Sequence, residues 1–270
     1  PRLLVLGQVG ERARAADDLA DFLGDLGLPG LVGFPGQAFD ELLGVVGGRL
    51  HRPLPAGQSQ RSPIDTASGG FADTVRMLRT TVVRHVAESG QSTIGVISPR
   101  RGEGKTFIAA HLAIALALDC NHTVLLVDAN LRRPALHRLF GITPEPGLSN
   151  HLLDAAPLAQ CLTNPGLDGL TVLPAGRPVE GSSEVLLSQP MCALATELRV
   201  RYPERIVVYD LPGALITDDV QAFMQMVEGY VLVVGAGVTR RDDIEDTMSM
   251  LRSNTLVCTV LNHPPSRGMR

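Results

Sequence analysis

Lysine, tryptophan and cysteine are scarce in this 270-residue chain, and each scarcity narrows what the protein can be. Tryptophan is absent, tyrosine occurs three times, and Lys105 is the single lysine among 24 basic residues. The four cysteines lie far apart without the C-x-x-C spacing of zinc or redox sites, which indicates reduced, buried thiols in a cytoplasmic protein. A net charge of −4 provides no positive surface for phosphate backbones, so we expect no nucleic-acid partner.

Long hydrophobic runs are missing as well. No uncharged apolar stretch approaches the roughly 20 residues that span a bilayer, and the first residues lack the pattern of a signal peptide. Apolar residues nevertheless make up 44% of the chain and charged residues 19%, which suits a protein with a sizeable buried core. The length fits one large domain, with or without a small appendage.

Short β-branched runs alternate with helical patterns from residue 93 onward. Runs of this kind, apolar on both faces, are typical of parallel strands that are covered by helices on each side. We expect strands at 93–97, 123–127, 170–173, 206–209, 230–234 and 255–261. The predicted fold is a doubly wound α/β domain with a mostly parallel sheet.

Composition divides the chain into three parts. Residues 1–50 are interpreted as a small N-terminal α/β extension, and residues 51–68 as a linker, because that stretch is polar and contains three prolines. Within the extension we expect strands at 3–6 and 31–34 and helices at 13–26 and 38–46. Residues 69–270 form the main domain, which begins with a helix predicted at 71–87 from its apolar stripe.

The only lysine lies in a phosphate-binding loop, Pro99-Arg100-Arg101-Gly102-Glu103-Gly104-Lys105-Thr106. The loop follows a predicted strand and begins a helix predicted at 105–118, which is the context in which backbone N–H groups converge on phosphate oxygens. Pro99 replaces the first glycine of the usual pattern. A lysine ammonium reaches nucleotide phosphates as a compact point charge, so arginine is no substitute at position 105.

Two aspartates end predicted strands farther along the chain. Asp210 follows an apolar run, as in a Walker B site, where the carboxylate holds Mg²⁺ directly or through water. Asp128 ends another strand and would face the crevice in which open α/β sheets bind ligands. Asp128 has two interpretations, a metal- or water-orienting residue and the N-cap of the following turn.

Several further stretches between about residues 70 and 262 match the sequence pattern of one protein family. Beyond the loop around Lys105 they are 128–134, 136–141, 173–176, 183–187, 210–212 and 260–262. Together they resemble the bacterial tyrosine kinases of capsule and exopolysaccharide synthesis, a family related to the MinD and ParA ATPases. Residues 210–212 and 217–220 are similar to the subgroup linked to exosortase loci. The resemblance implies a P-loop NTPase fold and an ATP- and Mg²⁺-dependent protein-tyrosine kinase that regulates exopolysaccharide polymerisation and export.

The same resemblance implies roles for individual residues. Lys105 would bind the β and γ phosphates, and Thr106, Asp128 and Asp210 would hold Mg²⁺, with Lys105, Asp128 and Asp210 as the catalytic residues. The implied nucleotide-binding set is Arg101, Gly102, Glu103, Gly104, Lys105, Thr106, Phe107 and Asn262.

Partners also follow from the resemblance. Besides ATP and ADP, it implies a membrane polysaccharide co-polymerase or an exopolysaccharide export protein that recruits this cytoplasmic chain to the inner face of the cytoplasmic membrane. Asp73, Arg76 and Arg79 resemble the family's self-association motif, with aspartate in place of glutamate, and imply a homo-oligomer through that helix. The alternative is an exposed helix face with a local pair between Asp73 and Arg76.

Departures from the family pattern leave other functions open. Asn130 stands where many members have a second aspartate, Gly213 where they have proline, and the tyrosine-rich tail is absent. One alternative is a MinD-like ATPase switch that dimerises or docks a partner without kinase activity, and another is a noncatalytic scaffold. Arg100 occupies the place of a lysine that crosses the dimer interface in MinD and ParA; it is either such a bridging residue or an exposed loop residue.

Overall fold

The computed structural model describes residues 31–34, 70–118, 122–202, 204–251 and 255–262. The elements expected at 3–6, 13–26 and 38–46, the linker and Cys120 lie outside these residues. Within the described residues no helix is long and apolar enough to cross a membrane.

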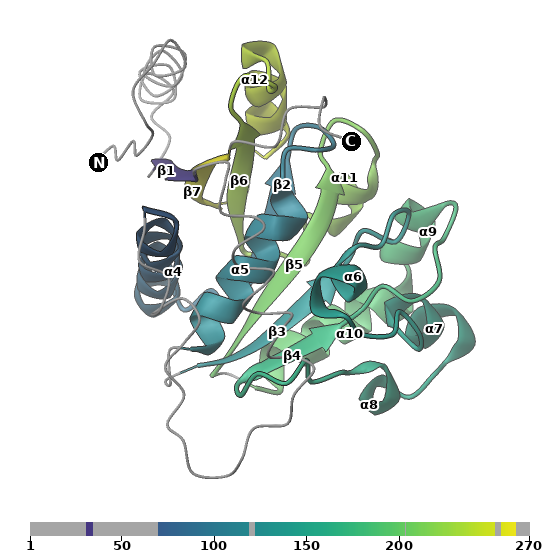
Figure 1. The fold of residues 1–270 in the computed structure, drawn as a ribbon. Helices are drawn as coiled ribbons and strands as arrows, with labels where there is room; N and C mark the ends of the chain where they lie inside the picture. Colours follow the sequence, from purple (N-terminus) through teal and green to yellow (C-terminus); the bar gives the residue numbers. More distant parts are fainter. Residues whose placement is uncertain (1–30, 35–69, 119–121, 203, 252–254, 263–270) are drawn as a thin grey trace, which may run out of the picture.

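Seven parallel strands form one sheet in the order β1-β7-β6-β2-β5-β3-β4 (Figure 1). They are β1 Leu31–Phe34, β2 Thr93–Ser98, β3 Thr123–Asp128, β4 Leu170–Leu173, β5 Arg205–Gly213, β6 Gly229–Gly235 and β7 Thr255–Asn262. All six neighbouring pairs are parallel. The central strands are buried throughout because helices cover both faces, which confirms the doubly wound α/β prediction.

The sheet separates two hydrophobic clusters, one on each of its faces. The helices are α4 Gly70–Ser89, α5 Lys105–Ala117, α6 Leu136–Phe140, α7 Leu148–Asp154, α8 Leu158–Cys161, α9 Ser182–Leu186, α10 Gln189–Val200, α11 Asp219–Phe223 and α12 Arg241–Met250. Side chains of α4, α5 and α6 pack on one face, and side chains of α7 to α12 pack on the other. Helix α5 is apolar almost all round, since it lies between the sheet and α4.

Most predicted boundaries agree with the structure to within one or two residues. The exception is β5, which continues through Pro212 to Gly213, so that Asp210 lies inside the strand instead of just after it. The strand predicted at 31–34 is present and pairs with β7 at the edge of the main sheet. The division into extension, linker and main domain remains a prediction. Cys192 corrects the expectation of buried thiols, because it is exposed on α10 while Cys161 and Cys258 are buried.

Candidate active site

The three chemical motifs meet at the carboxyl edge of the sheet. Strands β2, β5 and β3 are neighbours, and the register places Asp210 beside Val96 on one side and Asp128 on the other. The loop from Pro99 to Gly104 leaves β2 at the same edge and leads directly into α5 at Lys105. The topology therefore brings Lys105, Asp128 and Asp210 together, as the strand-end pattern predicts.

Gly104 allows the phosphate-binding loop to adopt its shape. It has a φ of 92° and is the N-cap residue of α5, without a side-chain cap on the first N–H groups of the helix. A Cβ at this position would lie 2.0 Å from Nδ2 of Asn262, which itself donates to the Glu103 carbonyl at 2.8 Å. Uncapped N–H groups at a helix N-terminus favour an anion, so the loop can hold a phosphate.

Lys105 is almost fully enclosed at this helix N-terminus, with 6% of its surface exposed. Burial lowers the pKa of its ammonium group, whereas the charge of Asp210, followed by that of Glu103, acts in the opposite direction. The side chain is thus a desolvated cation beside carboxylates, as expected of a residue that binds phosphate oxygens.

Asp128 is buried and its carboxylate already has three donors. Its Oδ2 accepts the backbone N–H groups of Ala135 and Leu136 at 3.0 and 3.1 Å, and its Oδ1 accepts that of Asn130 at 3.2 Å. Burial raises the pKa of this carboxyl group, although the three hydrogen bonds and the charge of Lys105 oppose the rise. Asp128 therefore anchors the start of α6 from seven positions upstream, although the N-cap residue of that helix is Ala135 and not Asp128.

Asp210 is equally buried but differs from Asp128 in its partners. Neither of its oxygens is within hydrogen-bonding geometry of a described residue, although the nearby Thr106 hydroxyl acts to lower its pKa. Burial, followed by the charge of Asp128, raises the pKa of Asp210, and Lys105 opposes the rise. A buried carboxylate without donors is costly, so this position fits a cation that completes its coordination.

The donors present suit a metal that is shared with phosphate. Among the described residues no group of three or more His, Cys, Asp or Glu side chains could hold a metal ion alone. Mg²⁺ commonly uses one or two carboxylates together with substrate phosphates and water. Thr106 and Asp210, at the start of α5 and on β5, provide a hydroxyl and a free carboxylate for such a site.

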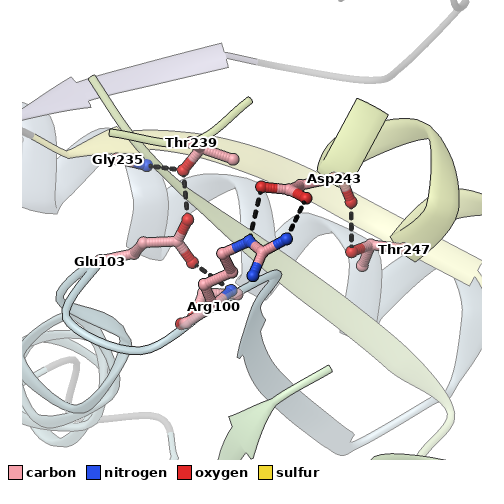
Figure 2. Close-up of polar contacts among 7 residues, drawn as sticks. Arg100, Glu103, Gly235, Thr239, Asp243 and Thr247 are labelled. Atoms are coloured by element: carbon pink, nitrogen blue, oxygen red, sulfur yellow. Dashed lines mark hydrogen bonds and ion pairs between the residues drawn. The ribbon is translucent and has the colours of Figure 1, made fainter. Parts of the chain in front are cut away.

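The first half of the phosphate-binding loop is hydrogen-bonded to Thr239, just before α12, and to Asp243, in its first turn (Figure 2). Arg100 donates to both oxygens of Asp243, from Nε at 2.7 Å and from a terminal nitrogen at 2.8 Å. Glu103 accepts the Arg100 backbone N–H at 2.6 Å and the Thr239 hydroxyl. Arg100, which could have been a bridging or a free loop residue, is thus half-exposed yet paired within its own chain. Sequence reasoning missed Thr239 and Asp243, because no local motif marks them.

A second network holds the loop that follows Asp128. Arg132 donates from Nε to the Ser182 hydroxyl at 2.8 Å and lies 3.3 Å from Oδ2 of Asp219. Ser182 in turn donates to the Asp219 carboxylate, and both of these residues are fully buried. The β3–α6 loop is thereby fixed to the N-termini of α9 and α11, beside the carboxyl edge of β5.

The remaining residues of the implied nucleotide-binding set lie around the loop in different ways. Arg101 and Gly102 are exposed, whereas the Phe107 ring packs on His111, 4.0 Å between centroids, and on the core. Gly213, one of the departures from the family pattern, lies against the loop, since a Cβ there would be 3.0 Å from the Arg100 carbonyl carbon.

Comparisons with known proteins agree with a nucleotide-binding fold. The family model for the CobQ/CobB/MinD/ParA nucleotide binding domain matches residues 94–261. The putative tyrosine-protein kinase CapB of Staphylococcus aureus is 23% identical over 74% of this chain and 88% of its own length. The tyrosine-protein kinase YwqD of Bacillus subtilis is 30% identical, over 63% of this chain and 71% of its own. Longer relatives such as etk of Escherichia coli are matched over 26% of their length.

Solved structures give the same fold. The BceF tyrosine kinase domain superposes with a TM-score of 0.72 at 26% identity, covering 90% of this chain and 97% of that domain. The chimerical protein CapA2B2 gives a TM-score of 0.73 at 25% identity, with 91% and 99% covered. MinD of Pyrococcus horikoshii, crystallised with Mg-ADP, shares the fold at a TM-score of 0.53 and 21% identity, with 64% and 73% covered.

Proposed function

Since the chain belongs to the CobQ/CobB/MinD/ParA nucleotide-binding family, we propose that it is an ATP- and Mg²⁺-dependent protein-tyrosine kinase of capsule or exopolysaccharide synthesis. One observation chiefly supports a nucleotide-binding site here. The carboxylate of Asp210 is buried without a hydrogen-bond partner, beside the buried Lys105 of a phosphate-binding loop. The choice of kinase over other nucleotide chemistry is supported by relatives named as tyrosine kinases.

Positioning and charge neutralisation supply most of the catalysis in phosphoryl transfer. The N–H groups at the start of α5 and the Lys105 ammonium would bind the phosphates, and Thr106 and Asp210 would hold Mg²⁺, which neutralises phosphate charge when bound. The acceptor is a tyrosine phenol: its oxygen bonds to the γ phosphorus, the bond to the bridging oxygen breaks, and ADP leaves.

The phenolic proton needs a base in the same place. We assign this role to Asp128, whose pKa is raised by burial and which stands beside Asp210 in the sheet. Three backbone donors fix its carboxylate while leaving one lone pair, on Oδ1, for a proton. Asn130 adds no charge here, so base strength rests on Asp128 alone among the residues of this loop.

Asn262 lies at the end of β7 beside the phosphate-binding loop. Its side-chain amide donates to the Glu103 carbonyl and lies against Gly104. We propose that it contributes to nucleotide binding by supporting the phosphate-binding loop from the end of β7.

The test of the proposed activity is transfer of labelled γ phosphate to a glutamate–tyrosine copolymer. Wild-type protein should form phosphotyrosine with Mg²⁺, and Lys105→Ala should form none. The matched control is Arg177→Ala, which removes an exposed cation that is paired with Asp154 and lies outside the phosphate-binding loop. Hydrolysis of ATP without any phosphotyrosine would support the ATPase switch instead and overturn the kinase proposal.

Self-association and membrane recruitment are also proposals. The Asp73–Arg76 pair on α4 is exposed, as is expected both of a local ion pair and of a surface available to a second copy. Light scattering of Arg79→Ala, with exposed Arg84→Ala on the same helix as control, separates the two. A smaller oligomer only in the first variant supports association through Asp73, Arg76 and Arg79. Recruitment by a membrane polysaccharide co-polymerase or export protein would be seen as co-sedimentation with vesicles that contain that partner.

A further inference from the structure

Four residues link the phosphate-binding loop to a segment more than 130 positions away in sequence. Arg100 and Glu103 belong to the loop, whereas Thr239 precedes α12 and Asp243 lies in its first turn. We refer to Arg100, Glu103, Thr239 and Asp243 as the loop clamp (Figure 2). None of the four binds or transfers phosphate in the proposed reaction through its side chain.

The loop clamp leaves no polar atom of its carboxylates without a partner. Asp243 uses both oxygens on the Arg100 guanidinium, and Glu103 uses one on the Arg100 backbone and one on Thr239. The Thr239 hydroxyl also accepts the Gly235 N–H at 2.8 Å, so it is fixed as a donor toward Glu103. Glu103 and Asp243 are 0% and 4% exposed, which makes these hydrogen bonds expensive to lose.

The contacts fall on one half of the loop only. Residues 100 to 103 are held by Thr239 before α12, Asp243 in α12 and Asn262 at the end of β7, whereas the N–H groups that follow Gly104 are left for a ligand. Ordering a loop on binding costs affinity, and a loop ordered beforehand avoids that cost. The first half therefore acts as a fixed support for the second.

We propose that Thr239 and Asp243 are positioning residues that hold the phosphate-binding loop in its nucleotide-ready shape, so that the segment from Thr239 to the first turn of α12 contributes to nucleotide affinity. The proposal rests on the nucleotide site described above and does not depend on the phosphoryl acceptor. Both residues act through Glu103 and Arg100 and touch no substrate themselves.

Titration of a fluorescent ADP analogue with Mg²⁺ tests the proposal. Thr239→Val keeps the side-chain shape but removes the hydroxyl, and Asp243→Asn removes the charge that pairs with Arg100. Each should weaken ADP binding roughly threefold to tenfold, the size of a charge-assisted hydrogen bond in a partly exposed setting. Thr239→Ser, which keeps the hydroxyl, should bind ADP like the wild type.

Two controls separate positioning from general stability. Asp154→Asn removes the carboxylate of another arginine pair, 2.8 Å from Arg177 and away from the loop, and should leave ADP affinity unchanged. The double variant Arg100→Gln, Asp243→Asn should lose no more affinity than either single variant, because both changes break one interaction. Thermal unfolding of every variant identifies any loss of fold.

The outcomes distinguish this proposal from the proposed activity. Equal ADP affinity in the wild type, Thr239→Val and Asp243→Asn would overturn the positioning role, whatever the kinase assay shows. Weak ADP binding by Thr239→Ser, or additive losses in the double variant, would also count against the loop clamp. If the wild type binds ADP but forms no phosphotyrosine, the kinase proposal is overturned and the positioning proposal is unaffected.

Discussion

Asp128 and Asp210 are register partners on neighbouring strands, yet Asp128 accepts three backbone N–H groups and Asp210 accepts none. Both are fully buried, and burial raises the pKa of each. Two carboxylates at one edge of the sheet thus differ in role. That of Asp128 holds the backbone between β3 and α6, and that of Asp210 is left for a ligand.

Removing the charge of Asp210 should stabilise the ligand-free protein. Its folded pKa is raised, so the folded state favours the protonated form, and stability is lost as pH rises from about 4 toward neutral. Asp210→Asn should raise the free energy of unfolding by roughly 1–3 kcal/mol at about pH 8, and by less at about pH 5, with a higher unfolding temperature in both cases. The variant should also lose the extra stabilisation that Mg-ATP gives the wild type. An unfolding temperature below that of the wild type at both pH values would contradict this account.

The matching change at Asp128 should be less favourable. The backbone N–H groups of Ala135 and Leu136 donate to Oδ2 of Asp128. In asparagine an NH₂ group can take the place of this oxygen, and it cannot accept their hydrogen bonds. Asp128→Asn should therefore be less stable than Asp210→Asn by about 1–3 kcal/mol at the same pH. Denaturant unfolding of the two variants side by side measures the difference, and equal midpoints would show that the three hydrogen bonds of Asp128 contribute little.

Strand positions and the three site motifs could be predicted from the sequence because each depends on local patterns. Lys105 is marked by its loop and helix, and Asp128 and Asp210 by the apolar runs before them. The contact of Asp128 with the start of α6 could not be predicted, since the backbone donors at Ala135 and Leu136 are placed by the turn between them.

The ion pairs that hold the loops of the site could not be predicted from the sequence. Arg100 and Asp243 are 143 positions apart, and Arg132 and Asp219 are 87 apart, so no spacing rule connects them. Their pairing depends on strand order, which brings the loops after β2, β3, β5 and β6 to one edge. The extension of β5 through Pro212 was missed because proline ends most strand patterns, but here the next residue, Gly213, pairs with Ser98 of β2.

Gly104 should tolerate no side chain. Its φ of 92° is unfavourable for other residues, and a Cβ would meet Asn262 at 2.0 Å. Gly104→Ala should abolish nucleotide binding while the fold persists. Adding Asn262→Ala removes the clash but not the backbone strain, so binding should recover only in part. Full recovery of ADP affinity in the double variant would mean that contact with Asn262 is the whole constraint.

Any phosphotyrosine that forms on this chain itself should lie at Tyr202. Tyr209 and Tyr230 are fully buried in β5 and β6, whereas Tyr202 is 42% exposed, with the Arg205 guanidinium 4.1 Å from its ring centre. Peptide mass spectrometry after incubation with Mg-ATP locates the modification. Phosphate on Tyr209 or Tyr230 would show that the sheet opens during the reaction.

Labelling of the only lysine tests the central claim, that Lys105 binds nucleotide phosphates, most directly. An acyl-phosphate derivative of ATP transfers its acyl group to an amine beside the bound phosphates, and Lys105 is the single lysine side chain in the 270 residues. We predict that this probe acylates Lys105 and that excess ATP with Mg²⁺ suppresses the reaction. Absence of the label, or a label at Lys105 that ATP does not reduce, would contradict the account.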